Sequence, residues 1–156
     1  MSNTKDLISA FGRFNDQLEK QVKNRVKLRG FSDISEHIDT GNLLFNALIS
    51  GSLRGGYPNA RSTGFAGDPG TGKTFLCLNA AKSAQDMGYG IHWIDTEGAL
   101  DKRDFDNFGL NRELINYKRI GVISEVKFYI NDIIKMAEEN PGLKMMVIVD
   151  STTQLS

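Results

Sequence analysis

The chain has 156 residues, of which 40% are hydrophobic and 24% charged, an ordinary composition for one globular domain with a single core. Its 19 basic and 19 acidic residues leave no net charge, so the whole chain lacks the basic excess that is usual for a nucleic-acid-binding domain. No apolar run approaches the ~18 residues that cross a bilayer, and the single cysteine, Cys77, excludes an intrachain disulfide. We therefore expect a cytoplasmic protein with no membrane partner.

The first thirty residues predict an amphipathic helix that ends near Gly30. Apolar side chains recur every three or four residues, at Leu7, Phe11, Phe14, Leu18, Val22 and Val26. Basic residues outnumber acidic ones over the same stretch, which is typical of a solvated helix face; a contact with nucleic acid or with a neighbouring subunit is the alternative. Residues 31–39 are expected to be a linker. We accordingly separate an N-terminal segment, 1–37, from a core, 38–156.

Residues 39–66 predict a short helix, a loop and a short strand. Asp39 or Thr40 can cap the helix, and its apolar positions are Leu43, Leu44, Phe45, Ala47 and Leu48. The Gly- and Pro-containing stretch SGSLRGGYPNARS, residues 50–62, predicts a loop. A strand over residues 62–66 would then lead into the next segment.

The octapeptide GDPGTGKT, residues 67–74, matches the phosphate-binding pattern G-x-x-x-x-G-K-[ST], known as Walker A. Glycines let the backbone take positive φ and approach a bulky anion without Cβ clashes. Successive N–H groups and the positive end of the following helix then attract phosphate. Lys73 would reach the β- and γ-phosphates of ATP, and the Thr74 hydroxyl would be a Mg²⁺ ligand. The rest of the expected cradle is Gly67, Asp68, Pro69, Gly70, Thr71 and Gly72.

The remaining elements alternate between helix and strand. We expect a helix from Lys73 to Met87 with Gly88 as its C-cap, a strand over 90–97, helical turns over 101–108 closed by Gly109, and a weak strand near 114–117. Ser124 can cap a helix reaching Glu139, broken by Pro141-Gly142, and residues 145–150 form an apolar strand. This order predicts an α/β fold, a parallel sheet with helices on both faces. Ligands gather at the carboxyl ends of such strands.

Acidic residues follow two of these strands. Asp150 ends an apolar strand, where a carboxylate can accept from a Mg²⁺-bound water. Glu97 lies at the edge of the strand over 90–97, where it could position and polarise the water that attacks ATP; Asp95 lies deeper and favours a structural role. Ser151 could hold the Asp150 carboxylate, sense the γ-phosphate, or be a plain turn serine.

With these sites in order, the chain resembles the RecA family of strand-exchange ATPases, and among them the phage recombinases of the UvsX kind. The supporting stretches are IDTGNLLFNALISGSLRGG (38–56), GDPGTGKTFLCLNAA (67–81), IHWIDTEGALD (91–101) and MVIVDST (146–152). The resemblance implies a RecA-like phosphate-loop NTPase core that binds ATP and Mg²⁺. It also implies a DNA-dependent ATPase that forms homo-oligomeric filaments on single-stranded DNA for recombination and repair.

The resemblance also implies residue roles. Lys73 and Thr74 would bind phosphate and Mg²⁺, Glu97 would activate water, and Asp150 would be the second acid on the magnesium side. Asp101 would lie near the adenine. The position of the family's base-stacking aromatic is Asp104 here, with Phe105 next to it.

In the family the sheet continues after the second acid, with a further strand between the glycine-loop strand and the strand that ends in Asp150. The DNA-binding loops also lie downstream. We therefore expect the front portion of a longer recombinase, truncated after the last strand and marginally stable alone. The alternatives are a RecA-like helicase or clock-type ATPase core, or a non-catalytic fragment that binds the parent filament through residues 1–30.

Overall fold

A computed structural model of the chain describes residues 9, 11–14, 17 and 34–152. The chain divides into two units, Met1–Asp33 and Ile34–Ser156. In the first unit, residues 9, 11–14 and 17 are helical, in agreement with that part of the expected amphipathic helix. Its other apolar positions and its expected end near Gly30 lie outside the described residues.

The second unit is built on a three-stranded parallel sheet with the strand order β4–β3–β5. The middle strand is β3 (Gly90–Asp95), flanked by β4 (Ile115–Arg119) and β5 (Met145–Asp150). The register places Asp95 beside Arg119 on one side and Asp150 on the other. The carboxyl ends of all three strands therefore meet at one edge of the sheet, which confirms the predicted α/β class.

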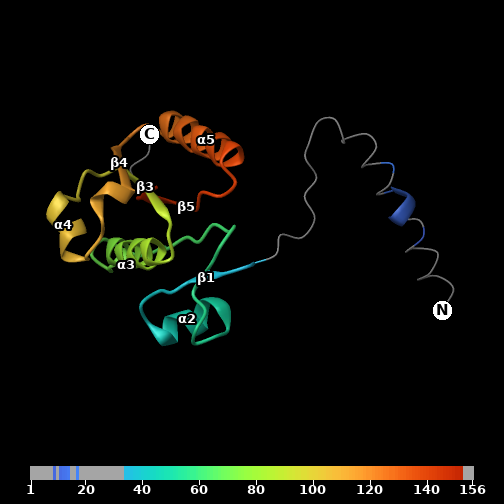
Figure 1. The fold of residues 1–156 in the computed structure, drawn as a ribbon, viewed down its shortest axis with the longest axis horizontal. Coiled ribbons are helices and arrows are strands. Elements are labelled where there is room, and N and C mark those ends of the chain that lie inside the picture. The colour runs from blue at the N-terminus through green and yellow to red at the C-terminus, as the bar shows by residue number, and fades with distance from the viewer. Residues whose placement is uncertain (1–8, 10, 15–16, 18–33, 153–156) are drawn as a thin grey trace. The chain divides into compact units, whose positions relative to one another are not determined.

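Helices cover both faces of this sheet (Figure 1). One face carries α3 (Lys73–Asp86) and α4 (Lys102–Asn107), and the other carries α5 (Ile123–Glu139). Successive side chains of a strand point to opposite faces: Trp93, fully buried, packs edge to face on Phe105 of α4, whereas the His92 ring contacts Tyr129 of α5. The helix ends near Gly88 and Gly109 agree with the sequence, since both glycines have positive φ just after α3 and α4.

A smaller substructure precedes the sheet. The strands β1 (His37–Ile38) and β2 (Tyr57–Pro58) pair antiparallel around α2 (Leu43–Ser50). The sequence predicts a linker and a loop here, and that prediction was wrong. Gly56, with φ 125°, lets the chain approach the Ile38 carbonyl oxygen more closely than any Cβ would allow. The predicted caps of α2 were also wrong. Asn42 caps the helix by accepting from the Phe45 N–H at 3.0 Å.

Three further boundaries differ from the prediction. The strand β3 ends at Asp95 and not at Glu97, because the next residues turn to donate their N–H groups to the Asp95 carboxylate. Ser124 does not cap α5; the cap is Val122, without a side-chain hydrogen bond. Residues 62–66 form no strand, because within residues 34–152 no strand pairs with them. A 3₁₀ turn, η1 (Arg112–Leu114), precedes β4.

Within the described part of the chain, none of the helices combines the length and the apolar character that are needed to cross a bilayer.

Candidate nucleotide-binding site

The glycine loop, residues 67–74, leads directly into α3. Gly70 and Gly72 have φ of 78° and 90°, values in the left-handed region that favours glycine. Gly72 is the N-cap of α3 and provides no side-chain hydrogen bond to the first turn. Because the first N–H groups of a helix have no partner within it, this helix start can donate to an anion.

The loop closes on itself through Thr71 and Lys73. The Thr71 hydroxyl donates to the Asp68 carbonyl oxygen at 2.8 Å, and a Cβ on Gly67 would lie 2.9 Å from the Thr71 oxygen. The Lys73 ammonium donates to the carbonyl oxygens of Gly67 and Asp68, at 2.8 and 2.9 Å. The positive charge of Lys73 is therefore held against the backbone of the loop itself.

Thr74 and Asp150 meet although 76 residues separate them. The Thr74 hydroxyl, in the first turn of α3, donates to Oδ2 of Asp150, the last residue of β5, at 2.7 Å. A hydroxyl and a carboxylate are hard oxygen donors that suit Mg²⁺, which commonly takes one or two protein oxygens and completes its shell with water and phosphate oxygens. The residues present fit that ion. The described residues hold no group of three or more His, Cys, Asp or Glu that could bind a metal ion by themselves.

Glu97 lies on the exposed turn that follows β3. Its Oε1 accepts a hydrogen bond from the Ser151 hydroxyl at 2.5 Å. Two consecutive residues after β5 thus contact both parts of the site. Asp150 accepts from Thr74 of the glycine loop, and Ser151 donates to Glu97 of the turn after β3.

Asp95 organises the backbone of the same turn. It is 2% exposed, and its carboxylate accepts from the N–H groups of Glu97, Gly98 and Leu100 and from the Tyr117 hydroxyl. Burial acts to raise the pKa of Asp95, but these hydrogen bonds outweigh it and the pKa lies below its usual value. Burial, together with the bond to Asp95, raises the pKa of Tyr117 to about 12.

The residues that the sequence leads us to expect near the adenine lie at the start of α4 and within it. Asp101 caps that helix by accepting from the Arg103 N–H, and its carboxylate also pairs with the Arg103 guanidinium. Asp104 completes the capping box. Phe105 is buried against Trp93 and Tyr117, so it cannot stack on a base. A hollow of about 390 Å³ beside α4 has Asp101 in its lining.

Two further residues at this edge escaped the sequence analysis. Thr96 bonds to the turn after β5. Arg119, at the end of β4, lies with its guanidinium so close to Gly98 that a Cβ there would collide with it. The parallel register of β3 and β4 does place Arg119 beside Asp95. The sequence alone gives no signal for this role of Arg119 or for that of Thr96.

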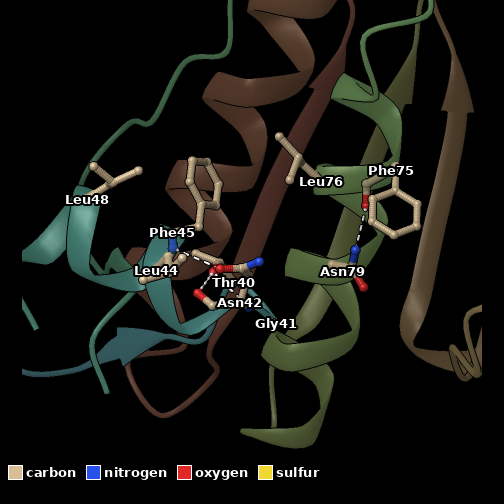
Figure 2. Close-up of a pocket in the computed structure, with 9 residues that line it drawn as sticks. All are labelled: Thr40, Gly41, Asn42, Leu44, Phe45, Leu48, Phe75, Leu76 and Asn79. Carbon is tan, nitrogen blue, oxygen red and sulfur yellow. Dashed lines mark hydrogen bonds between the residues drawn. The ribbon is translucent and has the colours of Figure 1, made fainter. Parts of the chain in front are cut away.

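A separate groove of about 450 Å³ lies between α2 and the start of α3 (Figure 2). Its apolar walls include Leu44, Leu48 and Phe75, and residues 67–74 do not line it. The two leucines are 73% and 81% exposed. This groove is therefore distinct from the site at the sheet edge.

A glycine loop that opens a helix at the carboxyl edge of a parallel sheet is an arrangement typical of nucleotide-binding α/β proteins. Among known proteins, the chain is similar to the RecA protein of Phytoplasma mali, with 32% identity over 101 residues, or 60% of this chain and 30% of that protein. It is also similar to a plasmid RecA protein of Lactococcus lactis, with 26% identity over 146 residues, or 89% of this chain and 39% of the relative.

The DNA repair and recombination protein RadB of Thermoplasma acidophilum is 29% identical over 111 residues, or 71% of this chain and 47% of RadB. No protein-family model matches the chain. The chain thus spans between 30% and 47% of the length of these relatives. The similarity supports a relation to the RecA family, and the α/β architecture is consistent with a RecA-like core.

Proposed function

We propose that this chain is the ATP-binding portion of a RecA-type, DNA-dependent ATPase that assembles on single-stranded DNA for recombination and repair. The observation that carries the proposal is the 2.7 Å hydrogen bond between Thr74 and Asp150, because it joins the end of the glycine loop to the acid at the end of β5. The similarity to RecA and RadB proteins supports the same family. Within it, the stretch 38–56 leads us to propose the phage recombinases of the UvsX kind.

The proposed roles follow from where each group lies. The N–H groups of residues 67–74 and the start of α3 bind the phosphates, and the Lys73 ammonium exchanges its two loop carbonyls for phosphate oxygens. Thr74 and Asp150 hold Mg²⁺, directly or through water, and the ion neutralises the charge that develops on the phosphates. Asp101 remains the proposed contact for the adenine edge, next to the hollow beside α4.

Glu97 is the proposed general base. It is the carboxylate of this edge that is exposed and bound to neither Thr74 nor a cluster of backbone N–H groups. Asp95, in contrast, is committed to four hydrogen bonds. A base must reach the attacking water within about 2.6–3.2 Å, and an exposed side chain on a turn can do so.

The test compares wild-type chain with Lys73→Ala and Lys82→Ala. The control removes the same charge from the same helix, where Lys82 pairs with Asp86 on the surface. Titration with a fluorescent ATP analogue in Mg²⁺ should give at least tenfold weaker binding for Lys73→Ala and unchanged binding for Lys82→Ala. Equal affinities would contradict the proposed site.

Hydrolysis assays separate the proposed motor from its alternatives. In the full-length protein, ATP turnover that rises with single-stranded DNA supports the recombinase, and turnover that ignores DNA favours a clock-type ATPase. Nucleotide binding without turnover, together with binding to a RecA-type filament, would favour the non-catalytic fragment. Glu97→Gln should bind the ATP analogue normally and lose turnover; retained turnover would move the catalytic role to another residue.

A further inference from the structure

The turns that follow β3 and β5 are hydrogen-bonded to each other through the backbone and the side chain of Thr96. The Thr96 N–H donates to the Asp150 carbonyl oxygen at 2.9 Å, which continues the ladder between the strands by one residue. The Thr96 hydroxyl donates to the Ser151 carbonyl oxygen at 2.6 Å and accepts from the Ser151 N–H at 3.1 Å. Both polar groups of the Ser151 backbone are therefore fixed by Thr96.

This arrangement determines where the Ser151 hydroxyl lies. With its backbone held on Thr96, Ser151 donates its hydroxyl hydrogen to Oε1 of Glu97 at 2.5 Å. The Glu97 backbone is fixed separately, because its N–H donates to Asp95 Oδ1 at 2.9 Å. Glu97 is therefore held at two points. Asp95 of β3 holds its main chain, and Ser151, which follows β5, holds its carboxylate.

An exposed glutamate on a turn otherwise samples many rotamers, and confining it costs conformational entropy. A misplacement of about 1 Å in a reacting group can lower a rate by about 100-fold. A carboxylate has two oxygens and about four acceptor sites, so the bond from Ser151 leaves acceptor capacity on Glu97 for a water. One oxygen can be fixed while the other acts on the reaction.

We propose that Ser151 is a positioning residue that orients the Glu97 carboxylate toward the attacking water, and that Thr96 holds Ser151 for this task. The inference rests on the proposed function of the site. In the step concerned, the water oxygen bonds to the γ-phosphorus and the bond from that phosphorus to the β–γ bridging oxygen breaks. ADP and inorganic phosphate form, and the water proton passes to Glu97. Ser151 exchanges no proton; it holds Oε1.

The kinetic test uses the full chain with Ser151→Ala, Ser151→Thr and Glu97→Gln, and the Ser151→Ala/Glu97→Gln double variant. Ser151→Ala should lower kcat about 10- to 100-fold while the Kd for the ATP analogue changes less than twofold. Ser151→Thr keeps the hydroxyl and should restore most of the activity. In the Glu97→Gln background, Ser151→Ala should have no further effect. An undiminished effect there would overturn the proposal, because Ser151 would then act through another group.

A structural test does not depend on turnover. Crystal structures of wild type and Ser151→Ala would show whether the Glu97 carboxylate keeps its place. We expect it to leave its wild-type rotamer or to spread over several. An unchanged, ordered carboxylate in Ser151→Ala would overturn the positioning role even if the protein hydrolyses ATP. A displaced carboxylate in a chain without ATPase activity would support the positioning and refute the proposed hydrolysis, so the two failures are distinguishable.

Discussion

The Asp95 carboxylate provides the sharpest test of how the sheet edge is built. In Asp95→Asn, one oxygen remains an acceptor and the other is replaced by an NH₂ group. Each carboxylate oxygen accepts two hydrogen bonds: Oδ1 from the N–H groups of Glu97 and Gly98, and Oδ2 from the Leu100 N–H and the Tyr117 hydroxyl. Turned one way, the amide points its donors at the N–H groups of Glu97 and Gly98. Turned the other way, it points them at the Leu100 N–H and at the Tyr117 hydroxyl, which can rotate to accept. At least one hydrogen bond is therefore lost in either orientation.

The expected cost follows from the lost hydrogen bond and from the loss of the negative charge that strengthens the remaining ones. Because Asp95 is 2% exposed, water does not replace a lost bond, and a hydrogen bond to a charged group contributes about 1.5–3 kcal/mol net. We expect Asp95→Asn to lower the free energy of unfolding by about 2–4 kcal/mol. The turn that carries Glu97 should loosen with it.

Urea denaturation followed by circular dichroism measures this change against a matched control. Asp132→Asn makes the same chemical change on α5, where Asp132 is 70% exposed and lies 3.7 Å from Lys135, and an exposed pair of this kind contributes about 0.5 kcal/mol or less. If Asp95→Asn and Asp132→Asn destabilise the chain equally, the four hydrogen bonds do not stabilise the turn and the reasoning fails.

Three other predictions follow from the same structure. Because the pKa of Asp95 is lowered on folding, its ionised carboxylate stabilises the fold fully above the unfolded-state pKa of about 4, and this stabilisation is lost as the pH falls through the folded-state pKa. Between neutral and acidic pH, the free energy of unfolding should therefore fall less in Asp95→Asn than in the wild type. An equal fall in both proteins would contradict this. Gly56→Ala must displace the backbone at Ile38 and should lower the free energy of unfolding by about 2–4 kcal/mol. The control Gly51→Ala, where φ is 75° and the space around the position is open, should lower it by about 1 kcal/mol. Similar shifts of the melting temperature in the two variants would contradict the described packing. Burial, with a contribution from the charge of Asp150, raises the pKa of Cys77 to about 11, so a thiol reagent at pH 7.5 should modify it at least about 100-fold more slowly than a free cysteine; fast modification would show that the helix is not packed as described.

The elements that the sequence predicted correctly are those with a long or specific local signal. The apolar run 145–150 and the alternation of helix and strand were sufficient for the sheet, and the pattern of residues 67–74 located the loop ahead of α3. Of the expected N-terminal helix, residues 9, 11–14 and 17 are described, and they are helical.

The errors came where the outcome depends on contacts distant in sequence. The strands β1 and β2 have two residues each, too few for any periodicity, and they form because Gly56 admits a close backbone approach. Asn42 caps α2 in place of Thr40, because the Thr40 hydroxyl donates to the side-chain oxygen of the buried Asn46.

The hydrogen-bond partner of Ser151 could not be predicted from the sequence either. Three roles were open for its hydroxyl, and only the pairing of β3 with β5 brings it to Glu97. The same pairing made Thr96 part of the site, although a threonine after a strand carries no signal of its own.

The central claim is that a triphosphate lies in the loop of residues 67–74 with its metal ion at Thr74. The most direct measurement is a crystal structure of the chain with Mg²⁺ and a non-hydrolysable ATP analogue. The account predicts a phosphate oxygen within hydrogen-bond distance of Lys73 Nζ and the metal ion bound to Thr74 Oγ1 at about 2.0–2.1 Å. An analogue bound elsewhere on the molecule, with Lys73 still on the carbonyls of Gly67 and Asp68, would contradict it.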